Sequence, residues 1–345
     1  MERRRLDALL LTNLENIRYA SRFTGSTATA VITNERAIIL VDSRYILQAA
    51  QECPKFEVKL YSGDVLKAAS ELLNELAPAR LGFEADYVTC STHRKLRSMI
   101  SKSTRLVAAR RTVEDLRIVK DREEIEKIRR AAQIADECFS HICSLIKPGM
   151  SEREVALEIY LFMYKKGSGP AFGSIVAAGP HAAFPHFQPT DTLIERGQMV
   201  KLDFGASLGG YNSDLTRTIF LGKPDEKFRK VYGVVLEAQR RAIAAIRPGK
   251  IGKEIDAVAR DFIASKGYGE YFGHGLGHSL GIGVHDGPGL TPTSDTVLAA
   301  GMVMTVEPGI YIEGWGGVRI EDDALVTRFG AEVLTTATKE IVVVA

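Results

Sequence analysis

The residues most suited to chemistry are acids inside apolar, strand-like segments. The segment Met199–Leu221 reads MVKLDFGASLGGYNSDLTRTIFL, and it predicts a β-hairpin that carries Asp203 and Asp214. A turn at Leu208-Gly209 would place the two carboxylates directly opposite each other, whereas a turn at Gly209-Gly210 would make them diagonal neighbours on one face. Aspartate is depleted in strands, and like charges paired across a ladder are destabilising. We therefore expect a cation between them.

A second predicted hairpin, Met302–Val326, repeats this arrangement with glutamates. If its turn is centred on Trp315, Glu307 and Glu321 share one face and are offset by a single diagonal step. Each hairpin thus delivers two acids to one side of its strands.

The segment between the two hairpins, residues 274–289, is rich in glycine and contains His274, His278 and His285. So many glycines disfavour a helix. They are typical of a strand or loop that approaches a ligand closely. No dinucleotide-binding glycine pattern fits this segment.

Four carboxylates and at least one imidazole offer more oxygen ligands than a single zinc ion needs. This donor set suits a pair of divalent ions, and its oxygen-rich character favours manganese. Manganese or cobalt is expected, with zinc or iron as alternatives. Two ions about 3.5 to 4 Å apart are a common arrangement for metal-assisted hydrolysis. The pattern therefore predicts a dimetal hydrolase.

The elements that must position these residues follow an internal repeat with an offset of 100. Ile146-Lys147-Pro148-Gly149 recurs as Ile246-Arg247-Pro248-Gly249, and Lys166-Gly167 recurs as Lys266-Gly267. Each copy reads as a helix, a Pro-Gly stop, a second helix and a β-rich region that ends in a hairpin. Two such halves are expected to pack about a pseudo-twofold axis, with the site where they meet.

Residues 1–115 are predicted to form a separate α/β domain, because short β-branched runs alternate there with helical stretches. Strands are expected at Ala30–Ile32, Ala37–Val41, Phe56–Leu60 and Arg80–Phe83, and helices at Ser43–Glu52, Asp64–Leu76 and Ser91–Ile100. The charged segment Glu114–Arg130 is expected to lead into the first helix of a second domain, residues 116–345.

Composition excludes several other classes. The chain has 345 residues and a formal charge of +2, which argues against nucleic acid as a partner. Its apolar runs are too short to span a bilayer, so no membrane partner is expected. The start of the chain lacks a signal-peptide pattern. Its four cysteines form no CxxC pair, and we expect a reduced, cytoplasmic protein.

Five motifs in order resemble the ligand signature of the pita-bread metallopeptidases. They are Asp203, the YNSDLTRT run with Asp214, HGLGH with His278, TVEPGIY with Glu307 and GGVRIEDD with Glu321. The N-terminal domain resembles that of the branch that contains Xaa-Pro aminopeptidase (aminopeptidase P) and prolidase. The resemblance covers essentially the whole chain. It implies a creatinase-like α/β N-terminal domain and an α+β pita-bread C-terminal domain.

The resemblance also implies roles for individual residues. Asp203 and Asp214 would bind one metal ion, Asp214 and Glu321 would bridge both ions, and His278 and Glu307 would complete the second site. Glu307 would also act as the proton shuttle.

Further residues are implied to surround the substrate. His285 would stabilise the oxyanion, His186 would lie beside the substrate, and His274 would line the proline pocket. Tyr311 and Arg319 would orient the acids, while Tyr211 either supports the site or packs in the core. His181 is expected at the surface, and a homodimer is expected.

Several activities fit this resemblance. The leading expectation is dimetal-dependent hydrolysis of the bond between an N-terminal residue and proline in proline-containing peptides, an Xaa-Pro aminopeptidase. The alternatives are an Xaa-Pro dipeptidase (prolidase), a methionine aminopeptidase, which would leave the first 115 residues without a role, and a non-catalytic peptide-binding relative.

The loop after His285 favours the aminopeptidase over the dipeptidase. A dipeptidase must bind the free carboxylate of proline, for which arginine is the best partner. Residues 285–301 contain neither lysine nor arginine, and Gly289 stands where many prolidase-like sequences have arginine. The sequence therefore predicts faster cleavage of Ala-Pro-Pro than of Ala-Pro, unless Arg44 or a partner subunit supplies the cation.

Overall fold

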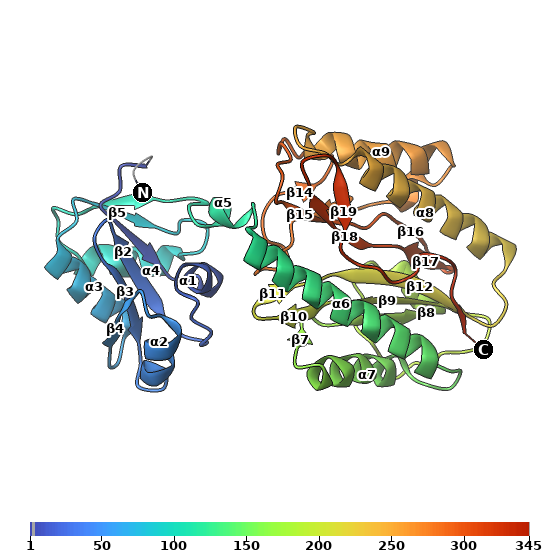
Figure 1. The fold of residues 1–345 in the computed structure, drawn as a ribbon, viewed down its shortest axis with the longest axis horizontal. Coiled ribbons are helices and arrows are strands. Elements are labelled where there is room, and N and C mark those ends of the chain that lie inside the picture. The colour runs from blue at the N-terminus through green and yellow to red at the C-terminus, as the bar shows by residue number, and fades with distance from the viewer. Residues whose placement is uncertain (2–3, 345) are drawn as a thin grey trace. The chain divides into compact units, whose positions relative to one another are not determined.

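The structure is a computed structural model that describes residues 1 and 4–344 (Figure 1). The chain divides into two compact units, Met1–Leu116 and Arg117–Ala345. The predicted domain boundary, after residue 115, lies one residue before this division.

The N-terminal unit contains one mixed sheet with the strand order β4-β3-β2-β1-β5-β6. Neighbours β1, β2 and β3 are antiparallel, whereas β3–β4, β1–β5 and β5–β6 are parallel. The strands are β1 (Ala8–Leu11), β2 (Thr29–Thr33), β3 (Ala37–Val41), β4 (Glu57–Leu60), β5 (Arg80–Phe83) and β6 (Arg105–Ala108). The helices are α1 (Leu14–Ser21), α2 (Ile46–Glu52), α3 (Val65–Leu76), α4 (Cys90–Met99) and α5 (Glu114–Arg117).

The strands and helices predicted for this unit are present, with ends that differ by up to three residues. The prediction lacked β1, α1 and β6. All four residues of β1 are buried, and β1 lies between β2 and β5. A run as short as ALLL shows no periodicity, so only its place in the sheet identifies it as a strand.

The C-terminal unit contains two helix pairs that form the predicted repeat. The first pair is α6 (Arg122–Leu145) and α7 (Glu152–Lys165), and the second is α8 (Glu226–Ala245) and α9 (Gly252–Ser265). Helix α9 begins and ends 100 residues after α7. The loops within the pairs place Gly149 and Gly249 at φ +89° and +86°, a conformation that favours glycine. The Pro-Gly stops therefore end the same helix of each copy.

The strands of this unit form several small sheets, whose orders are β11-β10-β7, β20-β12-β9-β8, β13-β14, β15-β18-β19 and β16-β17. Their bounds are β7 (Gly169–Pro170), β8 (Ile175–Ala178), β9 (Met199–Phe204), β10 (Ala206–Leu208), β11 (Tyr211–Asn212), β12 (Leu215–Leu221), β13 (Gly277–His278), β14 (Gly289–Leu290), β15 (Val303–Val306), β16 (Gly309–Ile312), β17 (Gly316–Arg319), β18 (Asp322–Val326), β19 (Ala331–Val333) and β20 (Val343–Val344). Short 3₁₀ helices are η2 (Gly179–Ala183) and η3 (Gly269–Tyr271).

Strand β9 is buried on both faces. Val200, Leu202 and Phe204 pack in a hydrophobic cluster with residues of α6 and α7, whereas Met199 packs in a second cluster with residues of α8 and α9. In Figure 1 the strands lie between α7 at the bottom and α9 at the top. Because successive side chains alternate, Lys201 and Asp203 share the face of Met199.

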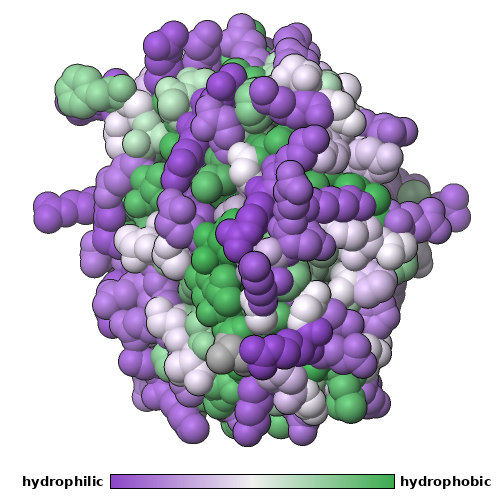
Figure 2. All heavy atoms as spheres, turned by 90° about the vertical axis from the view of Figure 1, so that its right-hand side faces the viewer, coloured by the Kyte–Doolittle hydropathy of each residue, from purple (hydrophilic) through white to green (hydrophobic). Residues whose placement is uncertain are grey.

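Hydrophilic side chains cover most of the face of the C-terminal unit seen in Figure 2, with hydrophobic atoms visible in a band between them. Within the described part of the chain, no helix is long and apolar enough to cross a membrane. The cysteines are free thiols, of which Cys53 and Cys138 are buried and Cys90 is exposed.

Candidate active site

The first pair of acids lies on the hairpin built from β9 to β12. Strand β9 pairs with β12 so that Asp203 faces Thr216, which makes Asp203 and Asp214 diagonal neighbours. The turn is Gly209-Gly210, where φ is +58° and +86°, as in a type I′ turn. Of the two turns predicted, Gly209-Gly210 is therefore confirmed and Leu208-Gly209 is wrong, because leucine is strained at the positive φ that this turn requires.

The second pair lies on the hairpin that runs from β15 to β18. The β15–β18 and β16–β17 ladders share one register, which places Glu307 opposite Glu321. The turn is centred on Gly314, at φ +73°. The predicted turn centre, Trp315, is therefore wrong by one residue. The predicted diagonal offset is wrong as well, because the two glutamates are directly opposite.

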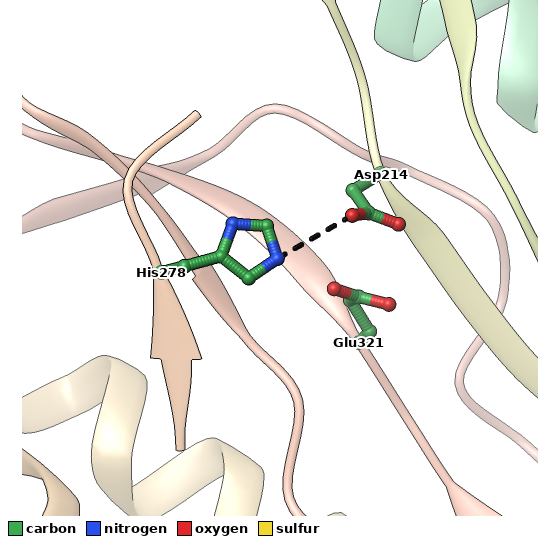
Figure 3. A group of neighbouring side chains, drawn as sticks. All are labelled: Asp214, His278 and Glu321. Carbon is green, nitrogen blue, oxygen red and sulfur yellow. Dashed lines mark ion pairs between the residues drawn. The ribbon is translucent and has the colours of Figure 1, made fainter. Parts of the chain in front are cut away.

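Asp214, His278 and Glu321 point toward one another (Figure 3). Each offers one ligand atom, and these atoms all lie within 4.8 Å of one another. Asp214 lies between β11 and β12, His278 ends β13, and Glu321 lies between β17 and β18. His278 Nε2 is 3.6 Å from Asp214 Oδ2. Among residues 1 and 4–344, these are the ligand side chains that lie close enough together to hold a metal ion.

The other two predicted ligands border on this group. Glu307 Oε1 lies 3.4 Å from His278 Nε2. Asp203 accepts a hydrogen bond from Arg319 Nη2, and Arg319 Nε lies 4.0 Å from Glu307 Oε2. The structure thus gathers all five predicted ligands in one cluster, with Arg319 between Asp203 and Glu307.

The acids of this cluster are costly to ionise without a cation. Burial, followed by the charges of neighbouring carboxylates, raises the pKa of Asp214 and of Glu321. Burial also raises the pKa of Glu307 to about 7, against the opposing charge of Arg319. Among the described side chains, Asp214 Oδ1 is a buried acceptor that lacks a hydrogen-bond partner. A divalent cation fits here, because it would satisfy this atom and neutralise the acids.

The imidazole of His278 is in the form that binds metal. Its Nδ1 lies 3.2 Å from Ser279 O, which leaves Nε2 facing the acids. Burial, followed by the charge of His285, lowers the pKa of His278 to about 4, so the ring is neutral at pH 7.

The remaining predicted histidines lie around the cluster. The ring centroid of His285 is 4.1 Å from that of His278. Burial lowers the pKa of His274 to about 4, with smaller contributions from the charges of Arg319 and His186. Burial also lowers the pKa of His285, and the charge of His186 lowers it further. His186 therefore lies within electrostatic range of both rings, and it is itself exposed.

Family models match both units. The model described as "Metallopeptidase family M24" matches residues 126–328, and the model described as "Creatinase/Prolidase N-terminal domain" matches residues 1–119. The chain belongs to metallopeptidase family M24. Its predicted fold class, a creatinase-like N-terminal domain and a pita-bread C-terminal domain with an internal repeat, is confirmed, and so is its prediction as a peptidase.

Relatives of this M24 peptidase match along nearly their whole length. The Xaa-Pro dipeptidase of Pyrococcus horikoshii is 37% identical, with 99% of this chain and 96% of the relative covered. The solved structure of the Xaa-Pro dipeptidase from Bacillus anthracis has 44% identity and a TM-score of 0.95, with 99% and 96% covered. That of the X-Pro aminopeptidase from Thermotoga maritima has 40% identity and a TM-score of 0.91, with 98% of each chain covered.

Arg319 of this M24 peptidase is buried and binds several groups around the acids. Its Nη1 donates to Tyr311 Oη at 2.9 Å and to Pro185 O at 3.1 Å. Its Nε donates to Thr216 Oγ1 at 3.0 Å. Tyr311 Oη also lies 2.9 Å from His274 Nε2. The predicted residues Arg319, Tyr311 and His274 therefore form one hydrogen-bonded chain.

Two threonines that sequence reasoning missed hold the glutamates. Thr216 Oγ1 donates to Glu321 Oε2 at 2.6 Å. Thr305 Oγ1 donates to Glu307 Oε1 at 3.1 Å and accepts from the His278 N–H at 2.9 Å. A signal was present for both, because each threonine is two residues from a predicted ligand, Asp214 or Glu307, in a strand-like segment, where such residues point to the same side.

Tyr211 and His181 each contact a buried glutamate. Tyr211 Oη donates to Glu124 Oε1 at 2.9 Å, and the ring packs in a hydrophobic cluster, so of its two predicted roles packing fits better. His181 was expected at the surface, and its side chain is 31% exposed. Its Nδ1 lies 2.9 Å from the buried Glu152 Oε1, and its ring stacks on Phe187 with 4.4 Å between centroids.

His285→Ala is expected to lower kcat by about 10²- to 10³-fold, the scale for one donor to an oxyanion, while the bound metal is retained. The ring is exposed and lies outside the metal-ligand group. Steady-state kinetics and metal analysis of the purified variant check this. His141→Ala is the matched control, because the His141 ring stacks on Phe162 of α7 instead. A parallel loss of metal would make His285 a ligand.

Proposed function

We propose that this M24 peptidase is an Xaa-Pro dipeptidase, a prolidase, that works as a homodimer with manganese or cobalt. The observation that carries the proposal is the match, over nearly the whole length, to the Xaa-Pro dipeptidases of Bacillus anthracis and Pyrococcus horikoshii. This reverses the order of the two activities expected from sequence. Zinc or iron would suit the same donor set.

Asp203, Asp214, His278, Glu307 and Glu321 would hold the divalent ions. When bound, such ions polarise the scissile carbonyl and make a nucleophile available at neutral pH. Glu307, whose carboxylate lies 3.4 Å from His278 Nε2, would accept and release the proton that the reaction moves. Thr305 fixes the carboxylate of Glu307, which keeps it in place for this transfer.

The histidines would bind the peptide. His285 is exposed beside His278 and can donate to the oxyanion of the tetrahedral intermediate. A bond to proline has no N–H, so recognition must use the ring and the flanking carbonyl and carboxylate groups. His186, exposed and within electrostatic range of His285, is suited to donate a hydrogen bond to the proline carboxylate.

The second candidate is the Xaa-Pro aminopeptidase predicted from sequence. The absence of lysine and arginine from residues 285–301 favours it, since no cation of that loop meets a free carboxylate. The resemblance to the X-Pro aminopeptidase from Thermotoga maritima supports it as well. An arginine at Gly289 is a poor test, because a Cβ there would lie 2.9 Å from Gly277 O.

Substrate preference decides between the candidates. For a dipeptidase, we expect kcat/KM for Ala-Pro to exceed that for Ala-Pro-Pro by about 10- to 100-fold, the scale of one hydrogen bond to a charged group. The measurement uses the manganese- or cobalt-loaded enzyme with Ala-Pro, Ala-Pro-Pro and Met-Ala-Ser side by side. The opposite preference would establish the aminopeptidase, and cleavage of Met-Ala-Ser alone would point to a methionine aminopeptidase.

A further inference from the structure

A buried lysine lies beneath the segment that leads to His186. Lys201 is on β9, two residues before Asp203, and its side chain is completely buried. Its neighbours Val200 and Leu202 pack toward α6 and α7, so strand alternation directs Lys201 to the side of the candidate metal site. No role of the cluster described above requires a lysine at this position.

The Nζ group of Lys201 binds main-chain carbonyls of the segment that precedes His186. Nζ donates to Ala182 O at 3.3 Å, Phe184 O at 2.5 Å and Pro185 O at 3.3 Å. Burial, followed by the charge of Arg319, lowers the pKa of Lys201 to about 6. Nζ carries two protons as an amine and three as an ammonium, so it can donate to these carbonyls in either form. A buried polar group is expensive unless it is hydrogen-bonded, so these bonds are essential to its presence here.

The same segment is held by other buried groups. Arg319 Nη1 donates to Pro185 O, and the Glu152 carboxylate accepts from Ala178 N and Thr190 N at the two ends of the loop. Gly317 lets the loop approach β17 closely, because a Cβ at position 317 would lie 2.3 Å from Ala182 O. Glu152 thus holds the ends of the loop, whereas Lys201 and Arg319 hold the carbonyls next to His186.

Lys201 cannot itself touch a substrate, because its side chain is completely buried and its donors are used by the loop. Nζ also lies 5.1 Å from the centroid of the Tyr311 ring, but its three hydrogen bonds go to the backbone before His186, and this is the path by which we expect it to act on the reaction. The first side chain after the bound carbonyls that faces solvent near the cluster is that of His186. Arg319, in contrast, also binds Asp203, so its removal would disturb the acids directly.

We propose that Lys201 is a positioning residue for His186: by binding the carbonyls of residues 182–185, it aims the His186 imidazole at the peptide beside the metal cluster. This inference rests on the proposed contact of His186 with substrate, and it holds for a dipeptidase and for an aminopeptidase alike.

A double-mutant cycle tests the proposal. Lys201→Met keeps most of the side-chain volume but removes all three donors. We expect His186→Ala to lower kcat/KM by about 10- to 100-fold, Lys201→Met to lower it by a similar factor, and the double variant to lose no more than about twofold beyond His186→Ala. Both single variants should change the same parameter, kcat or KM. The assay uses whichever of Ala-Pro and Ala-Pro-Pro the wild type cleaves faster, so it does not depend on which activity is correct.

A second cycle with His285→Ala is the matched control, because the bonds of Lys201 lead to the His186 loop and not to the loop of His285. In this cycle the losses should multiply. Metal content should stay at the wild-type level. If Lys201→Met is too unstable to purify, Lys201→Gln, which keeps one donor group, takes its place.

Three results would overturn the proposal. Losses that multiply in the His186 cycle would show that Lys201 acts independently of His186. Equal non-additivity in both cycles, or loss of metal in the Lys201 variant, would show that it supports the whole site. Full activity of Lys201→Met or of His186→Ala would show that the link has no catalytic effect.

Discussion

Removal of divalent ions with a chelator is expected to abolish peptidase activity and to lower the Tm of the enzyme. The reason is that Asp203, Asp214, Glu307 and Glu321 are gathered at one site, where burial raises the pKa of Asp214, Glu307 and Glu321. An ion at a concentration of a hundred times its Kd stabilises a fold by about 2.7 kcal/mol. For a domain of this size, that corresponds to a rise in Tm of about 5 to 10 °C. Activity assays and thermal scans with and without chelator measure both effects.

Asp214→Asn sharpens this test. It removes the buried carboxylate whose Oδ1 atom is unsatisfied, so the variant should be inactive and its Tm should respond little to chelator. Asp295→Asn is the control, because Asp295 is exposed and paired with Lys253 at the surface, and this variant should behave like the wild type. A chelated wild-type enzyme with full turnover would contradict the dimetal assignment.

Glu307→Gln is expected to lower kcat by about 10²- to 10⁴-fold, the usual contribution of a general acid or base, and yet to raise the Tm of the chelated protein at pH 8. Burial raises the pKa of Glu307 from 4.5 to about 7. A carboxyl group with a raised pKa contributes most stability below its unfolded pKa and loses that contribution as pH rises through 7. Glutamine carries no charge, so the chelated variant should have a higher Tm than the chelated wild type at pH 8, and the difference should vanish at about pH 4.5.

Thermal scans of the chelated wild type and variant at the two pH values check this prediction. Glu313→Gln is the matched control, because Glu313 is an exposed residue of the same hairpin and lies outside the cluster. If Glu307→Gln lowered the Tm at pH 8, the carboxylate would stabilise the empty site, and its pairing with Arg319 would outweigh its burial.

Much of the fold could be predicted from short stretches of sequence. The helix pairs follow from amphipathic segments that end at Pro-Gly, and Gly149 and Gly249 have the left-handed conformation that such a stop requires. The strands of the N-terminal unit follow from β-branched runs. Strand β1 could not be found in this way, because four apolar residues have no period and become a strand only by pairing with β2 and β5.

The chemistry of the site was visible in residue types. Acids inside apolar strands are unfavourable unless a cation compensates them, so Asp203 and Asp214 already indicated a metal site. The register was harder to predict, since a shift of one residue changes which side chains face each other. Both hairpins are centred on glycines at positive φ, Gly209-Gly210 and Gly314, and this backbone preference decided the registers.

Sequence alone therefore determined the kinds of element and the kind of chemistry, because both depend on local preferences: helical periodicity, strand alternation and the cost of charge in a strand. Only the tertiary structure decided which side chains meet. Asp214, His278 and Glu321 come from segments far apart in the chain, and Lys201 binds the loop that leads to His186. Such contacts arise from the burial of whole faces and from the need to satisfy buried polar groups, which local sequence does not encode.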